Sequence, residues 1–120
     1  MLERRNIKRR SISYYLRIVD STANKVIGHL ADISLQGLKI DSQVPIPTPK
    51  EYRLRIYTAA DVSDKDYIEF AASSRWCRQN PIEPGLYDIG FEIITIEPHD
   101  AEIIQRIMEK YSASESNFNF

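Results

Sequence analysis

The chain has little of what disulfides, metal sites and membrane helices require. Cys77 is the one cysteine among 120 residues, so neither an internal disulfide nor a cysteine-based metal site can form. His29 and His99 are too far apart in sequence for a metal-ligand spacing. No hydrophobic stretch approaches the roughly 20 residues that a membrane helix needs, and the N-terminus is charged where a secretion signal is apolar. We therefore expect a cytoplasmic protein without metal or other cofactor.

Sequence motifs of catalysis are also missing. The chain has no Ser-His-Asp order of a hydrolase, no glycine-rich phosphate loop and no motif of paired carboxylates. We therefore expect that the chain is not an enzyme. Its length, with 42% hydrophobic and 28% charged residues, predicts one domain that buries a single core.

Positive charge is concentrated near the N-terminus. Residues 3–10 (ERRNIKRR) carry five positive charges and one negative charge, a local charge of +4. Because the whole chain has a net charge of −1, the remaining residues sum to −5. A general nucleic-acid binder would need a basic face across the fold. This asymmetry favours one local anionic ligand instead.

The basic segment contains the motif Arg5-x-x-x-Arg9, with Arg4 directly before it. A guanidinium is a planar fork of donors that matches the O6 and N7 acceptors of guanine, and each good contact contributes about 1–3 kcal/mol of discrimination. Arginines also bind phosphates. A basic run near a terminus is more often a solvated tail, so the segment alone is weak evidence. Arg4-x-x-x-Lys8 is a competing register, and Arg5 with Arg9 is preferred.

A second polar motif, Asp32-x-Ser34-x-x-Gly37, follows at the end of a hydrophobic segment. An ionised Asp32 offers only acceptors, which complement the donor edge of guanine, and the Ser34 hydroxyl can donate or accept. We expect Gly37 to allow a positive φ and a close approach of the main chain to a ligand. Such residues also form ordinary turns. The arginine motif and this polar motif occur together, and the spacing between them leaves room for one β-hairpin. This combination indicates a single ligand site.

Together the two motifs resemble the two halves of the cyclic di-GMP site in PilZ domains. The resemblance covers about residues 3–110, and Trp76 followed by Gly90 and Phe91 is similar to the closing strands of these barrels. It implies a bacterial second-messenger receptor that signals to a protein partner, with Trp76, Gly90 and Phe91 in the core. The ligand-binding residues that it implies are Arg4, Arg5, Arg9, Asp32, Ser34 and Gly37.

Hydrophobic alternation and strand spacing predict a mainly β fold, a six-stranded barrel followed by a C-terminal helix. The resemblance implies that this is an antiparallel PilZ-like β-barrel. The expected strands are residues 12–19, 25–31, 38–40, 52–57, 67–76 and 86–94. Three prolines within residues 44–49 predict an extended connector. The first two strands form a hairpin, and because the start of one lies beside the end of the other, Arg9 and Asp32 should be neighbours.

An amphipathic helix is expected after the last strand. Pro98 suits a first helical position and Asp100 complements the helix dipole. The residues that recur at helical spacing are Ile103, Ile104, Ile107, Met108 and Tyr111. We expect this stripe to cover one mouth of the barrel. The predicted organisation is a flexible basic arm (1–11), the barrel (12–96), the helix (97–111) and a disordered polar tail (112–120).

In the favoured hypothesis, cyclic di-GMP orders the arm over the barrel rim and creates a surface for a protein partner. Two alternatives stay open. In the first, a small nucleic-acid-binding barrel tracks phosphates with its arm and stacks bases on Tyr14, Tyr15, Tyr52 and Tyr57. In the second, the chain is a PilZ-like adaptor that binds no ligand and whose arm contacts an acidic partner.

Overall fold

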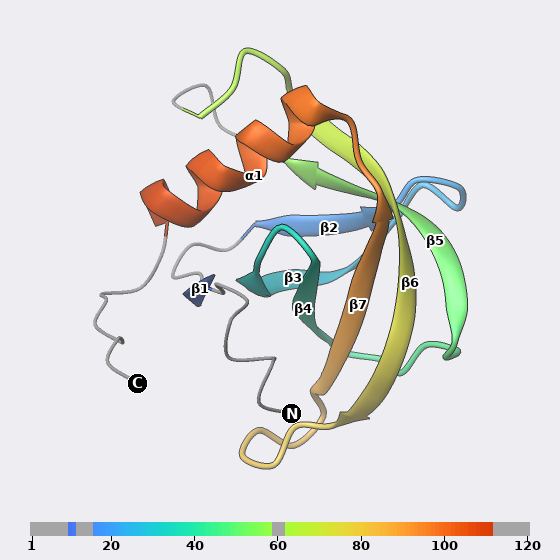
Figure 1. Cartoon of the computed structure of the whole chain (residues 1–120). Helices are drawn as coiled ribbons and strands as arrows, with labels where there is room; N and C mark the ends of the chain where they lie inside the picture. Colours follow the sequence, from blue (N-terminus) through green and yellow to red (C-terminus); the bar gives the residue numbers. More distant parts are fainter. Residues whose placement is uncertain (1–9, 12–15, 59–61, 112–120) are drawn as a thin grey trace.

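The computed structural model describes residues 10–11, 16–58 and 62–111. Its elements in chain order (Figure 1) are β1 (Arg10–Ser11), β2 (Arg17–Asp20), β3 (Lys25–Ile33), β4 (Gly37–Ser42), β5 (Lys50–Tyr57), β6 (Tyr67–Gln79), β7 (Tyr87–Thr95) and α1 (Pro98–Tyr111).

Six strands close into an antiparallel barrel. β2 pairs with β3 and β5, β5 continues through β6 and β7 to β4, and β4 pairs with β3 to complete the ring. β1 is an additional short strand along β3. The predicted six-stranded barrel with one C-terminal helix is therefore confirmed, and so is the hairpin between β2 and β3.

Alternation of apolar and polar residues explains why the strands form where they do. In β5, Tyr52, Leu54 and Ile56 are buried in the core while Arg53 and Arg55 face outwards. The prolines of residues 44–49 lie in the connection between β4 and β5, as predicted. The start of the first predicted strand, residues 12–15, lies outside the described part of the chain.

One end of the barrel is covered by α1, which lies across it in Figure 1. The buried face of the helix joins the same hydrophobic core as the strands and consists of Ile103, Ile104, Ile107, Met108 and Tyr111, as predicted. Asp100, in the first turn, accepts a 2.6 Å hydrogen bond from Lys65 in the β5–β6 loop. Arg106 donates to the Val62 carbonyl in the same loop. The helix is therefore fixed to the loop as well as to the barrel.

Tyr52 is only 7% exposed, and its ring contacts Phe91 edge-on with centroids 5.8 Å apart. It cannot stack on a base, so its role in the nucleic-acid hypothesis is wrong. Tyr57 faces outwards, whereas Tyr14 and Tyr15 lie outside the described residues. Among the described residues, none belongs to a helix that is both long and apolar enough to cross a membrane.

The predicted division into arm, barrel, helix and tail stays a prediction. Residues 112–120 and most of the arm lie outside the described chain. Arg10 and Ser11, at the end of the predicted arm, form β1.

Candidate ligand-binding site

The turn between β3 and β4 is built by the side chain of Ser34. Its Oγ accepts hydrogen bonds from the main-chain N–H groups of Gln36 and Gly37, both at 3.1 Å, and donates to the Gly37 carbonyl at 3.3 Å. The main-chain N–H of Ser34 donates to the same carbonyl. Ser34 is 2% exposed. Its hydroxyl therefore satisfies the backbone of the turn, which is the role of serine in many turns.

Ser34→Ala removes the acceptor of two main-chain N–H groups, so we expect the free energy of unfolding to fall by about 1–2 kcal/mol. Urea unfolding measures this loss. Ser21→Ala is the matched control because the Ser21 hydroxyl is exposed and water can replace its bond to the Arg53 carbonyl. Equal midpoints for both variants would contradict a structural role for Ser34.

Gly37 begins β4, and its missing side chain is explained by β7. A Cβ at this position would lie 2.5 Å from the Phe91 carbonyl oxygen, closer than real Cβ atoms approach. Gly37 does not use the positive φ that glycine allows, since the glycine with positive φ among the described residues is Gly85. Close packing of two strands, rather than a left-handed turn, requires glycine here.

Asp32 lies near the end of β3, one residue before the turn. Its carboxylate is 3.7 Å from Lys39 Nζ on β4, and the Asp32 side chain is 15% exposed. The main chain of Asp32 pairs with Ser11 in β1, while Ile33 pairs with Arg10. The end of the predicted arm therefore runs directly beside the polar turn.

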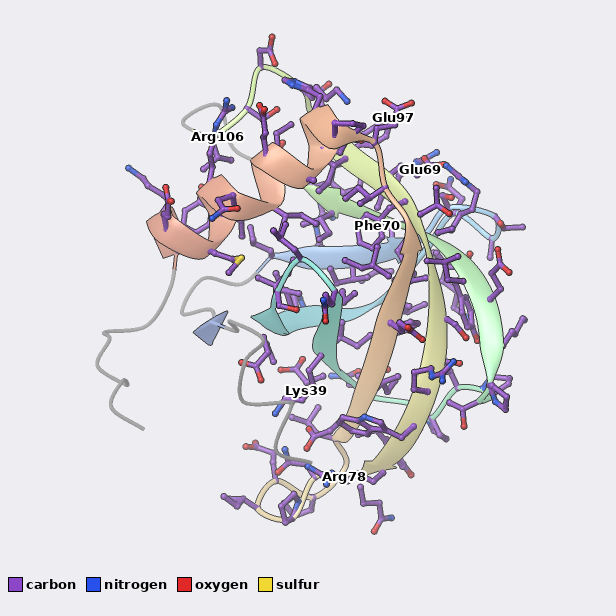
Figure 2. The ribbon with its side chains drawn as sticks, viewed as in Figure 1. Lys39, Glu69, Phe70, Arg78, Glu97 and Arg106 are labelled. Carbon is purple, nitrogen blue, oxygen red and sulfur yellow. The ribbon has the colours of Figure 1, made fainter. Side chains whose placement is uncertain are left out.

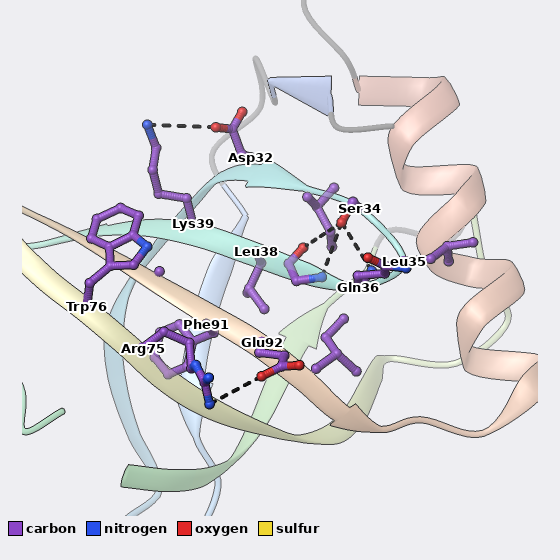
Figure 3. Close-up of a pocket in the computed structure, with 14 residues that line it drawn as sticks. Asp32, Ser34, Leu35, Gln36, Leu38, Lys39, Arg75, Trp76, Phe91 and Glu92 are labelled. Carbon is purple, nitrogen blue, oxygen red and sulfur yellow. Dashed lines mark hydrogen bonds and ion pairs between the residues drawn. The ribbon is translucent and has the colours of Figure 1, made fainter. Parts of the chain in front are cut away.

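A pocket of about 670 Å³ opens beside this turn (Figure 3). The volume falls within the range of about 300–1,000 Å³ that is typical of small-molecule sites. The turn and the neighbouring parts of β3, β4, β6 and β7 line the pocket. Its lining residues are Asp32, Ile33, Ser34, Leu35, Gln36, Gly37, Leu38, Lys39, Arg75, Trp76, Gly90, Phe91, Glu92 and Ile93.

Trp76 was expected in the core but is 40% exposed and lines the pocket. Its indole lies over Gly90, where a Cβ would collide with the ring. The Arg78 guanidinium lies 4.9 Å from the centroid of the Trp76 ring. The pairing of β6 with β7 shifts between Ser74 and Trp76. Such a bulge changes the direction of a side chain. The prediction for Phe91 is confirmed, because it is 4% exposed.

Charged groups of the described lining balance each other. Asp32 lies beside Lys39, and Arg75 Nη1 is 3.3 Å from Glu92 Oε1 (Figure 3). Two positive and two negative side chains give this lining no net charge. An anionic ligand therefore needs cations from elsewhere in the chain.

The predicted arginines of the arm, Arg4, Arg5 and Arg9, lie outside the described residues. The structure brings together Asp32, Ser34 and Gly37 with the backbone of Arg10 and Ser11. The expected contact between Arg9 and Asp32 stays a prediction. Sequence reasoning missed Lys39, Arg75 and Glu92 as lining residues. Alternation on β4 could have indicated Lys39, since it points outwards between the buried Leu38 and Ile40.

The family model described as PilZ domain matches residues 3–110. Among solved structures, the PilZ domain of YcgR from Escherichia coli, in a structure with c-di-GMP, is similar with a TM-score of 0.68 and 16% identity, over 90% of this chain and 91% of that one. The inhibitor of motility MotI/DgrA from Bacillus subtilis is similar with a TM-score of 0.64 and 18% identity, over 88% of this chain. This chain corresponds to 50% of the length of MotI/DgrA. No curated protein sequence matches. Since the family model spans most of the chain, from the arginine motif to the C-terminal helix, the chain belongs to the PilZ domain family.

Proposed function

We propose that the protein is a cyclic di-GMP receptor that reports ligand binding to a protein partner and catalyses no reaction. The observation that carries this proposal is the pairing of Ser11 with Asp32. Ser11 follows the arginine motif by two residues and Asp32 lines the pocket, so the chain directly after the motif lies at the pocket rim. Membership of the PilZ family and the E. coli domain with c-di-GMP support the choice of ligand. A cytoplasmic location follows from this proposed role.

In the proposed complex, the Asp32 carboxylate accepts hydrogen bonds from the donor edge of one guanine. Arg5 and Arg9 bind the O6 and N7 acceptors and the phosphates. Arg4 contacts a further phosphate or stacks on a base, which would allow two stacked ligand molecules to bind. Ser34 and Gly37 contribute by shaping the turn that holds Asp32 at the rim.

Ordering of the arm is the proposed signal. The described pocket lining has no net charge, whereas the ligand carries two phosphates, and in the proposed complex the arginine motif supplies the positive charge. Fixing each arm residue costs roughly 1–2 kcal/mol of backbone entropy. Contacts with guanine and phosphate offset this cost only when the ligand is present. Ligand binding therefore shifts the population towards an ordered arm and a new surface.

Hydrogen–deuterium exchange tests this signal. Amides of residues 1–11 are expected to exchange more slowly with saturating cyclic di-GMP, while amides in the strands of the core change little. Ligand binding without protection of the arm would contradict the proposed signal and leave the proposed ligand intact.

Trp76 provides an optical test because it is the only tryptophan and lines the pocket. A bound ligand excludes water from the exposed part of the indole, so we expect a saturable change in emission on addition of cyclic di-GMP. Cyclic di-AMP is the control, since adenine carries an amino donor where guanine has O6. Emission that stays constant while calorimetry detects binding would place the ligand outside this pocket.

A further inference from the structure

A cluster of arginine and tyrosine side chains lies on the outside of β2, β5 and β6, away from the pocket. Arg55 pairs in register with Val19 on β2 and Glu69 on β6, so these three share one face. We call this surface the arginine–tyrosine face. Its members are Arg17, Arg53, Arg55, Tyr57, Tyr67 and Glu69.

Two arginines of the face share one carboxylate. Arg53 Nε donates to Glu69 Oε2 at 2.8 Å, and Arg55 Nε donates to Glu69 Oε1 at 3.1 Å. The hydrogen bond from Arg53, together with that from Arg55, lowers the pKa of Glu69 below its ordinary value. Each guanidinium has five N–H donors, and these two bonds use one from each. The face therefore already binds one carboxylate, that of Glu69, through an Nε–H group of each of two arginines.

Tyrosine rings contact two of the three arginines. The Arg17 guanidinium lies 5.3 Å from the centre of the Tyr57 ring, and that of Arg55 lies 4.7 Å from the centre of the Tyr67 ring. The two rings contact each other with centroids 5.4 Å apart. Stacking of this kind restricts the rotamers of both partners. Arg17 and Arg55 are thus preorganised, which reduces the entropy cost of binding a partner.

Fold stability accounts better for the contact of Arg55 with Glu69, whose side chains are 24% and 26% exposed, than for that of Arg53. Exposed ion pairs contribute only about 0–1 kcal/mol, and the side chain of Arg53 is 56% exposed. Three arginines against Glu69 give the face a charge of +2 in a chain whose net charge is −1. Arginine and tyrosine are the residues enriched at the centres of protein interfaces. Composition, charge and rigidity therefore indicate an interaction surface.

We propose that the arginine–tyrosine face docks an acidic segment of a partner protein. This inference names the partner surface of the proposed adaptor and so rests on the proposed function. An acidic protein segment is favoured over a nucleic acid as the partner because the positively charged region of the face is short. Asp20 ends β2, and Asp64 and Asp66 precede β6, so a long polyanion would meet negative charge at its margins.

The face and the ligand pocket use different parts of β6. Glu69 lies towards one end of the strand and Arg78 at the other in Figure 2. Arg75, which lines the pocket, is six residues from Glu69, roughly 20 Å along an extended strand. The two sites can therefore be changed independently by substitution.

The test uses a capped peptide of eight glutamates, its glutamine counterpart and a twelve-nucleotide thymidine strand as probes. Each is titrated into the full-length protein at low salt while amide and arginine Nε signals are followed by NMR. We expect the glutamate peptide alone to produce saturable shifts on β2, β5 and β6. Equal binding of the glutamine peptide, shifts confined to the arm or pocket, or tighter binding of the oligonucleotide would each overturn the proposal.

Variants then assign the contact. The double substitution Arg17→Gln and Arg53→Gln is expected to weaken peptide binding at least tenfold. Glu69→Gln removes the competing carboxylate and is expected to tighten binding at least threefold, a gain that a folding defect cannot produce. Arg75→Gln, on the same strand but in the pocket, is the matched control and should leave peptide affinity unchanged. Unchanged affinity in both face variants would reject the proposed surface.

A parallel titration with cyclic di-GMP separates this inference from the proposed function. The variants at Arg17, Arg53 and Glu69 should bind the dinucleotide with wild-type affinity. Normal dinucleotide binding with no peptide binding would reject the docking face alone. Normal peptide binding with no dinucleotide binding would reject the proposed receptor function and leave an acidic-segment adaptor.

Discussion

Each of the variants Arg5→Ala, Arg9→Ala and Asp32→Ala is expected to bind cyclic di-GMP roughly 5- to 150-fold more weakly than the wild type. This corresponds to a loss of about 1–3 kcal/mol of binding free energy. The arginine variants remove a two-donor contact to guanine or phosphate. The Asp32 variant removes the carboxylate that is proposed to accept from guanine at the rim of the pocket, and it also removes the ion-pair partner of Lys39. Isothermal titration calorimetry measures the loss.

A charge-matched control accompanies the Asp32 variant. Asp64→Ala removes one exposed carboxylate from the β5–β6 loop, outside the pocket, and should bind the ligand with wild-type affinity. The melting temperature of the ligand-free arginine variants should stay near that of the wild type. Unchanged affinity in all three site variants would discard the assigned site.

Gly37→Ala is expected to lower the free energy of unfolding by about 1–3 kcal/mol, even without ligand. The added Cβ would lie 2.5 Å from the Phe91 carbonyl oxygen, so β4 and β7 would have to separate locally. Main-chain atoms cannot rotate away as a flexible side chain can. Denaturant unfolding of the ligand-free protein measures this cost directly.

Gln36→Ala is the control for this substitution. Gln36 is exposed in the same turn, and its contact with β7 is the bond from the Ile93 N–H to its main-chain carbonyl, which alanine retains. Its stability should therefore match that of the wild type. If Gly37→Ala were as stable as Gln36→Ala but lost ligand affinity, the glycine would serve ligand approach and the packing explanation would be wrong.

The barrel could be predicted from the sequence because its signals are local. Alternation in β5 and the polar turn after β2 indicate strands and a hairpin from neighbouring residues alone. The helix could be predicted for the same reason, since Ile103, Ile104 and Ile107 recur at helical spacing. The pairing of β4 with β7 joins residues far apart in sequence, so no local pattern indicates it.

The details of the site depend on contacts between distant segments. The requirement for glycine at position 37 arises from Phe91, which no local pattern at the turn reveals. Trp76 is exposed because the ladder between β6 and β7 shifts next to it. A simple alternation cannot indicate a bulge whose position is set by the partner strand. The sequence therefore predicted the motif but not the physical role of each of its residues.

Calorimetric titration of the full-length protein with cyclic di-GMP and, separately, cyclic di-AMP tests the central claim most directly. We predict saturable binding of cyclic di-GMP that is lost or strongly weakened in Arg9→Ala, and markedly weaker binding of cyclic di-AMP. Absence of heat and of any other binding signal with cyclic di-GMP, or equal affinity for both dinucleotides, would contradict a guanine site formed by the arginine arm and Asp32.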